Sequence, residues 1–304
     1  MPQDAGPAGP PGQAGGQAGG PTARAIPPGL HFVATPIGAA RDITLRGLDI
    51  LAGADVLAAE DTRTLRHLMD IHGLPARGRP FVAYHDHNGA EARPRLLAAL
   101  AEGRSVAYVS EAGTPLVADP GFQLGRAAIA AGHPVHAAPG ASAVLAALTV
   151  AGLPTDRFLF AGFPPATGAA RRRWLEEIAN VPATLVIYES PKRVGELLVD
   201  CVHSLGGERE AAVCRELTKR FEEVRRGTLT ELAADHADRT VKGEVVLVID
   251  RARGRRVEAA EVEAALVEAL TRMRVKDAAA AVAESLGLPK REVYQAALRL
   301  GKER

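Results

Sequence analysis

Ser105-Val-Ala-Tyr-Val-Ser-Glu-Ala-Gly-Thr-Pro115 is the segment of this 304-residue chain that says most about its fold. Ser105–Val109 has the composition of a buried strand, and the strand stops at a turn of small and polar residues. In that turn Gly113 lets the backbone approach a ligand closely, and Pro115 fixes the direction in which the chain leaves. The stretch therefore predicts a strand whose carboxyl end presents main-chain groups to a ligand.

Two other strands in the same half of the chain end in similar turns. Phe32-Val-Ala-Thr-Pro-Ile-Gly38 and His136-Ala-Ala-Pro-Gly-Ala-Ser-Ala143 both run into a Pro/Gly turn, and the second continues into a helix capped near Ser142. The carboxyl ends of parallel strands meet at one edge of a sheet, where open α/β folds bind ligands. None of the turns forms a GxGxxG fingerprint or a P-loop, so NAD and ATP receive little support. The residues expected to hold the ligand, mainly through backbone groups, are Pro36, Gly38, Ser110, Glu111, Ala112, Gly113, Thr114, Pro139, Gly140 and Ser142.

Apolar strands and helical segments alternate outward from these turns. The expected strands of the first half are His31–Thr35, Asp55–Ala59, Phe81–Tyr84, Ser105–Val109 and Pro134–Ala138. The expected helices are Leu45–Leu51, Thr64–Ile71, Glu91–Ala101, Gln123–Ala131 and Ala141–Val150. This alternation predicts a mainly parallel sheet covered on both faces. We assign a disordered tail to residues 1–29 and an N-terminal α/β domain to residues 30–152.

A second α/β domain is predicted over residues 153–250. Its expected strands are Arg157–Ala161, Thr184–Tyr188, Ala211–Arg215 and Val245–Asp250, and its helices are Ala169–Ile178, Arg193–Ser204 and Leu229–His236. The spacing from Glu216 to Gly227 suits paired strands, so this sheet should be mixed. The predicted fold class is α/β, with two α/β domains, an interdomain cleft that binds the ligand, and a small C-terminal helical module.

The last 54 positions, residues 251–304, are expected to form a linker and that helical module. Its predicted apolar stripe consists of Val262, Leu266, Ala269, Leu270 and Met273. Two further helices, Asp277–Leu286 and Arg291–Leu300, flank a Gly287-Leu-Pro289 turn and resemble a helix-turn-helix. Acidic and basic residues are about equally common here, so a packing or dimerisation bundle is expected as readily as a nucleic-acid reader.

The composition limits the partners and the compartment. With 37 Lys and Arg against 36 Asp and Glu, the net charge of +1 predicts no general attraction to nucleic acid or membrane. Any polyanion must meet local basic groups, which gather in the second domain as Arg171-Arg-Arg173, Lys192-Arg193, Lys219-Arg220 and Arg225-Arg226. No apolar run approaches the ~20 residues that span a bilayer, and no signal peptide is evident. We expect a cytoplasmic protein whose two cysteines, Cys201 and Cys214, are buried free thiols.

Two polar clusters follow strands of the first domain and supply candidate chemistry. Glu60-Asp61-Thr-Arg63 offers two carboxylates for substrate binding or proton handling, although Asp61 or Thr62 could equally cap a helix. Tyr84-His-Asp-His-Asn88 places His85 and His87 on one face if extended. Because no third ligand is evident, a polar rim for the substrate is favoured over a metal site.

Taken in order, these blocks resemble the tetrapyrrole methylase superfamily, the class III S-adenosylmethionine-dependent methyltransferases. The similar blocks of the first domain are Ala34-Thr-Pro-Ile-Gly38, Ala59-Glu-Asp-Thr-Arg63, His85-Asp-His-Asn88, Ser110–Pro115 with Asp119-Pro-Gly121, and Pro139-Gly140. Those of the second are Gly152-Leu-Pro-Thr-Asp-Arg-Phe158, Tyr188-Glu-Ser-Pro-Lys-Arg193, Arg215-Glu-Leu-Thr-Lys219 and Lys242-Gly-Glu244. The resemblance covers about residues 30–250, and the helical module fits it too.

The resemblance implies S-adenosyl-L-methionine as the cofactor, bound by the three turns, and a homodimer. The most similar branch methylates the 2′-hydroxyl of a decoding-centre cytidine in 16S rRNA of the small ribosomal subunit. Candidates for removing the hydroxyl proton are Glu60, Asp61, Glu189 and Lys192. Candidates for contacting the substrate are Arg63, His85, His87, Asn88, Arg193 and Lys219, and no metal is expected.

Two departures from the family pattern fall in the proposed cofactor turns. Glu111 stands where the family usually has Asp, and Ala39 where it usually has Asn. Binding through the backbone would tolerate both. Two alternatives remain: a methylase of a corrin or porphyrin precursor on the same fold, and a non-catalytic nucleic-acid-binding regulator that uses residues 258–304.

Overall fold

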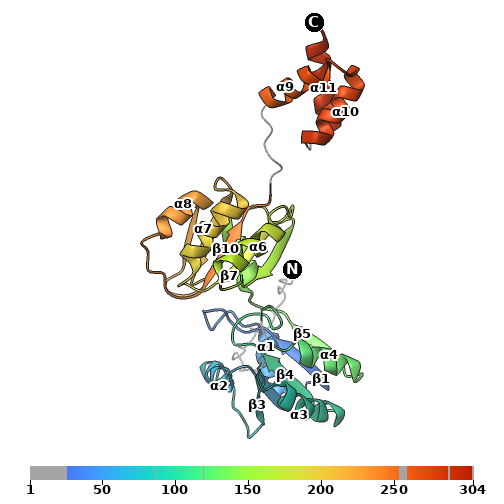
Figure 1. Ribbon diagram of the computed structural model, residues 1–304. Helices are drawn as coiled ribbons and strands as arrows, with labels where there is room; N and C mark the ends of the chain where they lie inside the picture. The colour runs from blue at the N-terminus through green and yellow to red at the C-terminus, as the bar shows by residue number, and fades with distance from the viewer. Residues whose placement is uncertain (1–25, 86, 119, 253–258, 287, 303–304) are drawn as a thin grey trace, which may run out of the picture.

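The chain forms two α/β units and a separate bundle of C-terminal helices (Figure 1). The structure is a computed structural model that describes residues 26–302, except residues 86, 119, 253–258 and 287. Most of the predicted tail therefore lies outside the described residues. Gly29, which we assigned to the tail, is instead the first residue of β1 (Gly29–Val33) and pairs with Ser105.

The first sheet is entirely parallel, as predicted. Its strand order is β3-β2-β4-β1-β5, with β2 Val56–Ala59, β3 Phe81–Ala83, β4 Ser105–Val109 and β5 Val135–Ala138. The strands β1, β2 and β4 are buried along their whole length, which explains their nearly continuous apolar sequences. The strand predicted over His31–Thr35 already ends at Val33, because Thr35 forms an antiparallel bridge with Gly113 instead of continuing the parallel pairing.

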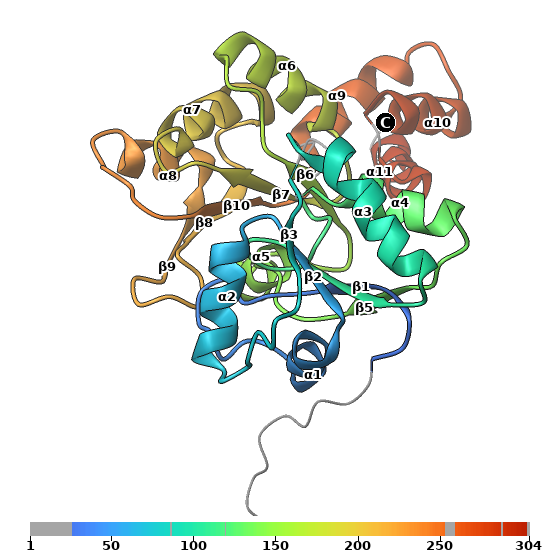
Figure 2. The same cartoon turned by 90° about the horizontal axis from the view of Figure 1, so that it is seen from below.

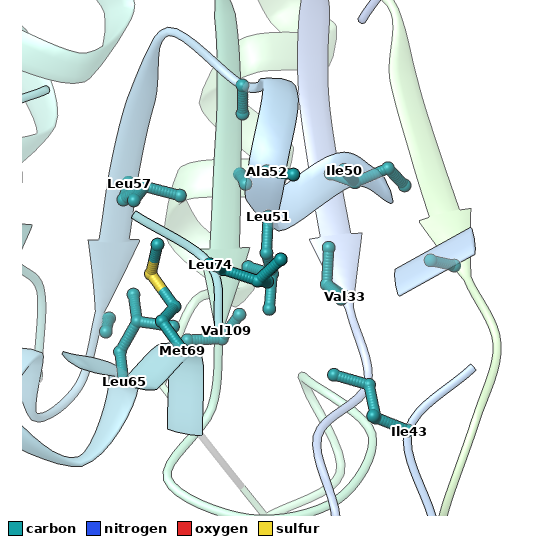
Figure 3. Packing of buried hydrophobic residues seen from close by; sticks show 14 residues of the cluster. Val33, Ile43, Ile50, Leu51, Ala52, Leu57, Leu65, Met69, Leu74 and Val109 are labelled. Carbon is teal, nitrogen blue, oxygen red and sulfur yellow. The ribbon is translucent and has the colours of Figure 1, made fainter. Parts of the chain in front are cut away.

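Helices cover both faces of this sheet, again as predicted. Figure 2 shows α1 (Leu45–Gly53) and α2 (Thr62–Ile71) on one face, and α3 (Gly89–Ala101) and α4 (Phe122–Ala130) on the other. On the first face, side chains of α1, α2 and the following loop meet those of β1, β2 and β4 (Figure 3). The residues labelled there include Val33, Leu51, Leu57, Leu65, Met69, Leu74 and Val109.

The second sheet is mixed, as the sequence predicted. Its order is β6-β7-β10-β8-β9, with β6 Phe158–Gly162, β7 Thr184–Glu189, β8 Glu210–Arg215, β9 Glu223–Thr228 and β10 Val245–Ile249. Only the β6–β7 pair is parallel, and β8 and β9 form the expected pair of adjacent strands. The helices α6 (Gly168–Ile178), α7 (Val194–Leu205) and α8 (Leu229–His236) pack their apolar faces on one side of it.

The other side of the second sheet is covered by a helix from the first unit. The helix α5 (Ala143–Ala151) places Val144, Ala147 and Leu148 in one apolar cluster with side chains of β7, β8 and β10. At its C-terminal end, the Arg226 guanidinium of β9 donates to the carbonyls of Val150 and Ala151, the latter at 3.1 Å. A cation at a helix C-terminus is stabilising, so α5 joins the two units by both packing and charge.

The two cysteines are buried free thiols, as expected, and burial raises the pKa of each to about 12. No helix in the described part of the chain has both the length and the apolar character needed to cross a bilayer.

The C-terminal bundle contains α9 (Ala259–Ala269), α10 (Val275–Leu286) and α11 (Lys290–Lys302). Its small core gathers around Leu266, Val282 and Ala297. The predicted stripe holds for Val262, Leu266 and Ala269, but Met273 is 48% exposed. The prediction was wrong there because α9 ends at Ala269, so the next residues no longer follow the helical period.

Candidate active site between the two sheets

A cleft of about 630 Å³ lies between the two α/β units. One wall comes from the turns after β1 and β4, from the end of β2 and from the start of α5. The other comes from the residues after β6 and β7, the loop between β8 and β9, and the start of β10. An interdomain cleft was predicted, and the structure confirms it.

The first wall lies where neighbouring strands of the first sheet connect to helices on opposite faces. From β1 the chain turns to α1 on one face, and from its neighbour β4 it turns to α4 on the opposite face. Adjacent strands whose connections part in this way leave a crevice at their carboxyl ends. The crevice therefore follows from the order of the strands and needs no special side chains.

Hydrogen bonds tie the two turns of this crevice together. The Thr35 N–H donates to the Gly113 carbonyl at 2.9 Å, the Gly113 N–H donates back to Thr35 at 3.1 Å, and the Ser110 hydroxyl donates to the Gly113 carbonyl at 3.0 Å. Gly113 has φ +81°, and a Cβ there would lie 3.2 Å from Cγ2 of Ile37. The position therefore favours glycine for both its backbone angle and its space.

The third turn is attached to the second. The Thr114 hydroxyl donates to the Ala141 carbonyl at 2.9 Å, just before Ser142 takes the N-cap position of α5. The capping position agrees with the prediction, but the Ser142 side chain accepts no hydrogen bond from the helix. The start of α5 thus faces the cleft with the partial positive charge of a helix N-terminus.

Eight of the ten residues predicted to hold a ligand line this cleft: Pro36, Gly38, Ser110, Glu111, Ala112, Gly113, Thr114 and Ser142. Pro139 and Gly140 are not among its lining residues. A Cβ on Gly140 would lie 2.9 Å from Cβ of Ala34, so this glycine serves the close packing of β1 against the third turn.

The second wall carries residues that sequence reasoning did not single out as site residues, notably Phe163, Tyr188 and Glu244. Tyr188 lies between the two units, and burial raises its pKa to about 12. A hydrogen bond from the Val144 backbone lowers the pKa, but by less than burial raises it. The phenol therefore stays protonated at neutral pH. The Tyr188-Glu-Ser-Pro block was a usable signal, whereas an isolated Phe163 after β6 gave none.

The loop from Glu216 to Lys219 reaches across to the first wall. Glu216 and Thr218 adopt φ of 51° and 64°, which is uncommon for residues other than glycine and is typical of functional loops. The Thr218 hydroxyl accepts the Ala39 N–H at 3.1 Å, and Gly38 sits so close that a Cβ would lie 2.5 Å from Cγ of Lys219. Lys219 lines the cleft, and its ammonium lies 3.0 Å from Glu216 and 3.1 Å from Glu244.

The four candidate catalytic groups occupy different surroundings. Glu60 lines the cleft at the end of β2, whereas Asp61 is the N-cap of α2. Hydrogen bonds from the Arg63 side chain and then from its backbone lower the pKa of Asp61 to about 2. Glu189 lines the cleft but is fully buried: it pairs with Arg193 at 2.6 Å, and its Oε2 has no partner among the described residues. Lys192 is exposed and is not a lining residue.

The other predicted substrate contacts lie outside the cleft. The Asn88 side chain accepts the His85 N–H at 2.8 Å and donates to the Ala83 carbonyl, so it shapes the turn after β3. The rings of His85 and His87 lie 6.1 Å apart, and the described residues contain no His/Cys/Asp/Glu cluster that could hold a metal ion. Arg63 is exposed beside Asp61, and neither it nor Arg193 lines the cleft.

Most of the basic residues predicted as phosphate contacts are engaged inside the protein. Arg171 is 3% exposed and pairs with Asp200 at 2.6 Å, Arg225 pairs with Glu223 and Asp235, and Arg226 caps α5. For Arg171 the expectation of a contact with a polyanion was wrong, because the Asp200 carboxylate on α7 neutralises it.

Lys192 and Arg220 differ from those residues. Each follows a residue that lines the cleft, Pro191 and Lys219 respectively, and each is exposed. Across the described residues, neither side chain takes part in an ion pair or hydrogen bond, although Arg220 lies over the Phe221 ring at 5.5 Å. They are the cations of the second domain best placed to meet an anion at the rim of the cleft.

Comparison with known proteins identifies relatives of both parts of the chain. Residues 29–233 match the family Tetrapyrrole (Corrin/Porphyrin) Methylases, and residues 256–301 match the RsmI C-terminal HTH domain. The chain is 49% identical to Ribosomal RNA small subunit methyltransferase I of Mesorhizobium japonicum, over 91% of this chain and 94% of that protein.

Two solved structures are similar in fold. A cobalt precorrin-4 methyltransferase has a TM-score of 0.56 at 17% identity, covering 73% of this chain and 94% of that one. The second is a uroporphyrin-III C-methyltransferase from Thermus thermophilus, solved in complex with S-adenyl homocysteine. Its TM-score is 0.50 at 20% identity, and the match covers 72% of this chain and 96% of that one.

Proposed function

Since this chain belongs to the tetrapyrrole (corrin/porphyrin) methylase family and, within it, to the group of the ribosomal RNA small subunit methyltransferase I proteins, we propose that it methylates 16S rRNA. The methyl donor is S-adenosyl-L-methionine, and the acceptor is the 2′-hydroxyl of a decoding-centre cytidine. The observation that carries the proposal is the cleft, in which two backbone turns and the N-terminus of α5 converge on one side.

The cleft suits a ligand with the chemistry of S-adenosylmethionine. Glu60, Glu111 and Glu244 line it, and the one lysine there, Lys219, is already paired with two carboxylates, so the walls favour a cation such as a sulfonium. The start of α5 at Ser142 can accept a carboxylate. When bound, the cofactor supplies a methyl group that its sulfonium already activates. The groups we propose to hold it are the turns at Pro36–Gly38, Ser110–Thr114 and Ser142.

The protein's own task is then to align a ribose hydroxyl and receive its proton. A hydroxyl held in line with the methyl group reacts as in a unimolecular step. We propose Glu60 as the proton acceptor, because it lines the cleft, whereas Asp61 caps α2 and the Glu189 carboxylate is held by Arg193. Glu189 is proposed as a positioning residue: its Oε1 accepts the Ser190 N–H at 2.6 Å and holds Arg193, which fixes the turn after β7.

Lys192 and Arg220 are proposed as the phosphate contacts. Lys192→Ala and Arg220→Ala should each raise KM for the RNA substrate and flatten its dependence on salt, the slope falling by about 0.7 for each single-strand phosphate that is no longer neutralised. KM measured between low and moderate salt checks this. Arg173→Ala, which removes an exposed arginine of α6 away from the cleft, is the control. An equal effect of all three variants would contradict the assignment.

The experiment that tests the function is methyl transfer from labelled S-adenosylmethionine to small ribosomal subunits that lack their decoding-centre modifications. Naked rRNA and a tetrapyrrole precursor are run in parallel, and the modified nucleoside is identified by mass. We expect 2′-O-methylcytidine on the subunit. Transfer only to the tetrapyrrole would replace the proposed substrate while keeping the cofactor.

We also propose that the protein works in the cytoplasm and forms a homodimer. Sedimentation of the purified protein would test the homodimer.

A further inference from the structure

Phe163 is an aromatic side chain that the fold leaves exposed on the wall of the cleft. It follows β6, an edge strand of the second sheet, and it is part of the cleft lining although 56% of the residue is exposed. Aromatic residues make up only 4% of this chain. A single exposed apolar side chain is ordinary on a protein surface, so Phe163 is set apart by its place on the wall of the cleft.

The backbone before Phe163 departs from regular strand geometry. The pairing of β6 with β7 shifts register between Phe160 and Gly162, and Gly162 takes φ +74° with no atom within 4 Å of a Cβ placed on it. Nothing crowds that glycine, so its role is to supply the backbone angle. Irregularities of this kind change the direction of the next side chain and are frequent beside active sites. Here the next side chain is Phe163.

Behind Phe163 stands a rigid aromatic support. Its ring meets Tyr188 edge-on, with centroids 5.5 Å apart and planes at 66°, and Phe160 meets the same tyrosine at 4.8 Å and 64°. Tyr188 is in turn held by the hydrogen bond with the Val144 backbone at the start of α5. The Phe163 ring is therefore in contact with the protein through Tyr188, and more than half of the residue is accessible from solvent.

We propose that Phe163 is the stacking platform for the nucleobase of the substrate nucleotide. This inference rests on the proposed function, because it takes an RNA strand as the substrate. A base that leaves its neighbours in the RNA loses their stacking energy. It recovers stacking energy by lying on an aromatic face, which is how proteins commonly hold single-stranded nucleotides. Lys192 and Arg220, at the rim of the cleft's second wall, supply the cations for the neighbouring phosphates.

The cofactor also carries a nucleobase, its adenine, which could in principle stack on Phe163. The position of Phe163 in the second unit argues that the ring stacks on the substrate base instead. All the turns proposed to hold the cofactor belong to the first unit, whereas Phe163 belongs to the second. Substrate and cofactor must approach from separate walls if a hydroxyl is to lie in line with the methyl group. The Phe163 ring is accordingly assigned to the substrate base.

Substitution of Phe163 tests the assignment. Phe163→Ala should raise KM for unmodified small subunits about 5- to 150-fold, the range that loss of one base–aromatic stack produces, with kcat changed far less. Phe163→Trp should retain a KM near wild type, whereas Phe163→Leu, which keeps apolar volume without an aromatic face, should behave like alanine. Binding of S-adenosylmethionine, measured by calorimetry, should be unchanged in all three.

Phe158→Ala is the matched control, because Phe158 is an exposed phenylalanine at the opposite end of the same strand. Equal effects at both positions would overturn the proposal. A loss of S-adenosylmethionine affinity with an unchanged KM for subunits would assign the ring to the cofactor adenine instead.

A second measurement separates this inference from the proposed function. In Phe163→Trp, a single-stranded oligocytidine should quench the fluorescence of the new tryptophan, and Phe158→Trp should show no such quenching. If wild-type protein fails to methylate subunits while the oligonucleotide still quenches, the proposed reaction fails and the stacking site stands. Absence of quenching in an enzyme active on subunits overturns the stacking site alone.

Discussion

Gly113→Arg should abolish binding of S-adenosylmethionine while leaving the fold intact. Gly113 has φ +81°, a conformation that costs other residues about 1–2 kcal/mol, and its Cβ would already touch Ile37 at 3.2 Å. A side chain as long as arginine has to extend into the cleft between the turns. Calorimetric titration with the cofactor measures the loss, which we expect to exceed about 100-fold in Kd, equivalent to about 2.8 kcal/mol. Circular dichroism reports the fold.

Gly103 provides the control for backbone strain. It precedes the same strand, β4, has φ +74°, and has no atom within 4 Å of the position a Cβ would take. Gly103→Arg therefore carries a similar conformational cost at a site remote from the cleft. It should lower stability slightly and leave cofactor affinity unchanged. Normal cofactor binding by Gly113→Arg would contradict the placement of the cofactor in these turns.

Asp200→Ala should destabilise the protein by about 3–5 kcal/mol, the usual cost of leaving a buried charge without its partner. The Asp200 carboxylate accepts from Nε of Arg171 at 2.6 Å and from Nη1 of Arg172 at 2.9 Å. The side chains of Arg171 and Asp200 are only 4% and 8% exposed, so water cannot take the place of the missing carboxylate. Denaturant unfolding followed by circular dichroism gives the change in the free energy of unfolding.

Glu196→Ala separates this burial effect from charge loss in general. Glu196 also pairs with Arg171, at 3.2 Å, but its side chain is 67% exposed. An exposed pair contributes roughly 0–1 kcal/mol, so this variant should remain close to wild type. If both variants were destabilised equally, the buried pair of Arg171 and Asp200 would not be the main charged contact between α6 and α7.

The first wall of the site was predictable because its determinants are local. A strand such as Ser105–Val109 followed by a turn with Gly113 is recognisable from a few consecutive residues, and parallel strands bring their carboxyl ends together. The second wall is assembled from residues far apart in sequence. Phe163 and Glu244 meet there only through the pairing of β6, β7 and β10, and no short pattern reveals that order.

Charged residues were the least predictable from sequence. Arg171 and Lys192 both stand in basic runs, yet the first is buried against Asp200 and the second is exposed beside the cleft. Whether an arginine or lysine is buried or exposed depends on whether a neighbouring helix offers it a carboxylate. The carboxylate that pairs with Arg171 belongs to Asp200, 29 positions further along the sequence. Asp61 shows the same limit: the sequence left capping and catalysis open, and the structure shows Asp61 at the N-cap of α2.

The position of α5 has a consequence for how the chain can be divided. By sequence, the natural cut lies near Gly152, after the last helix of the first unit. Cutting there would separate Val186, Val246 and Val248 from the apolar face of α5, leaving one fragment with a bare apolar helix and the other with a bare apolar sheet face. Neither half is a self-sufficient module. The chain therefore cannot be divided at Gly152 without taking from the second sheet the helix that covers one of its faces.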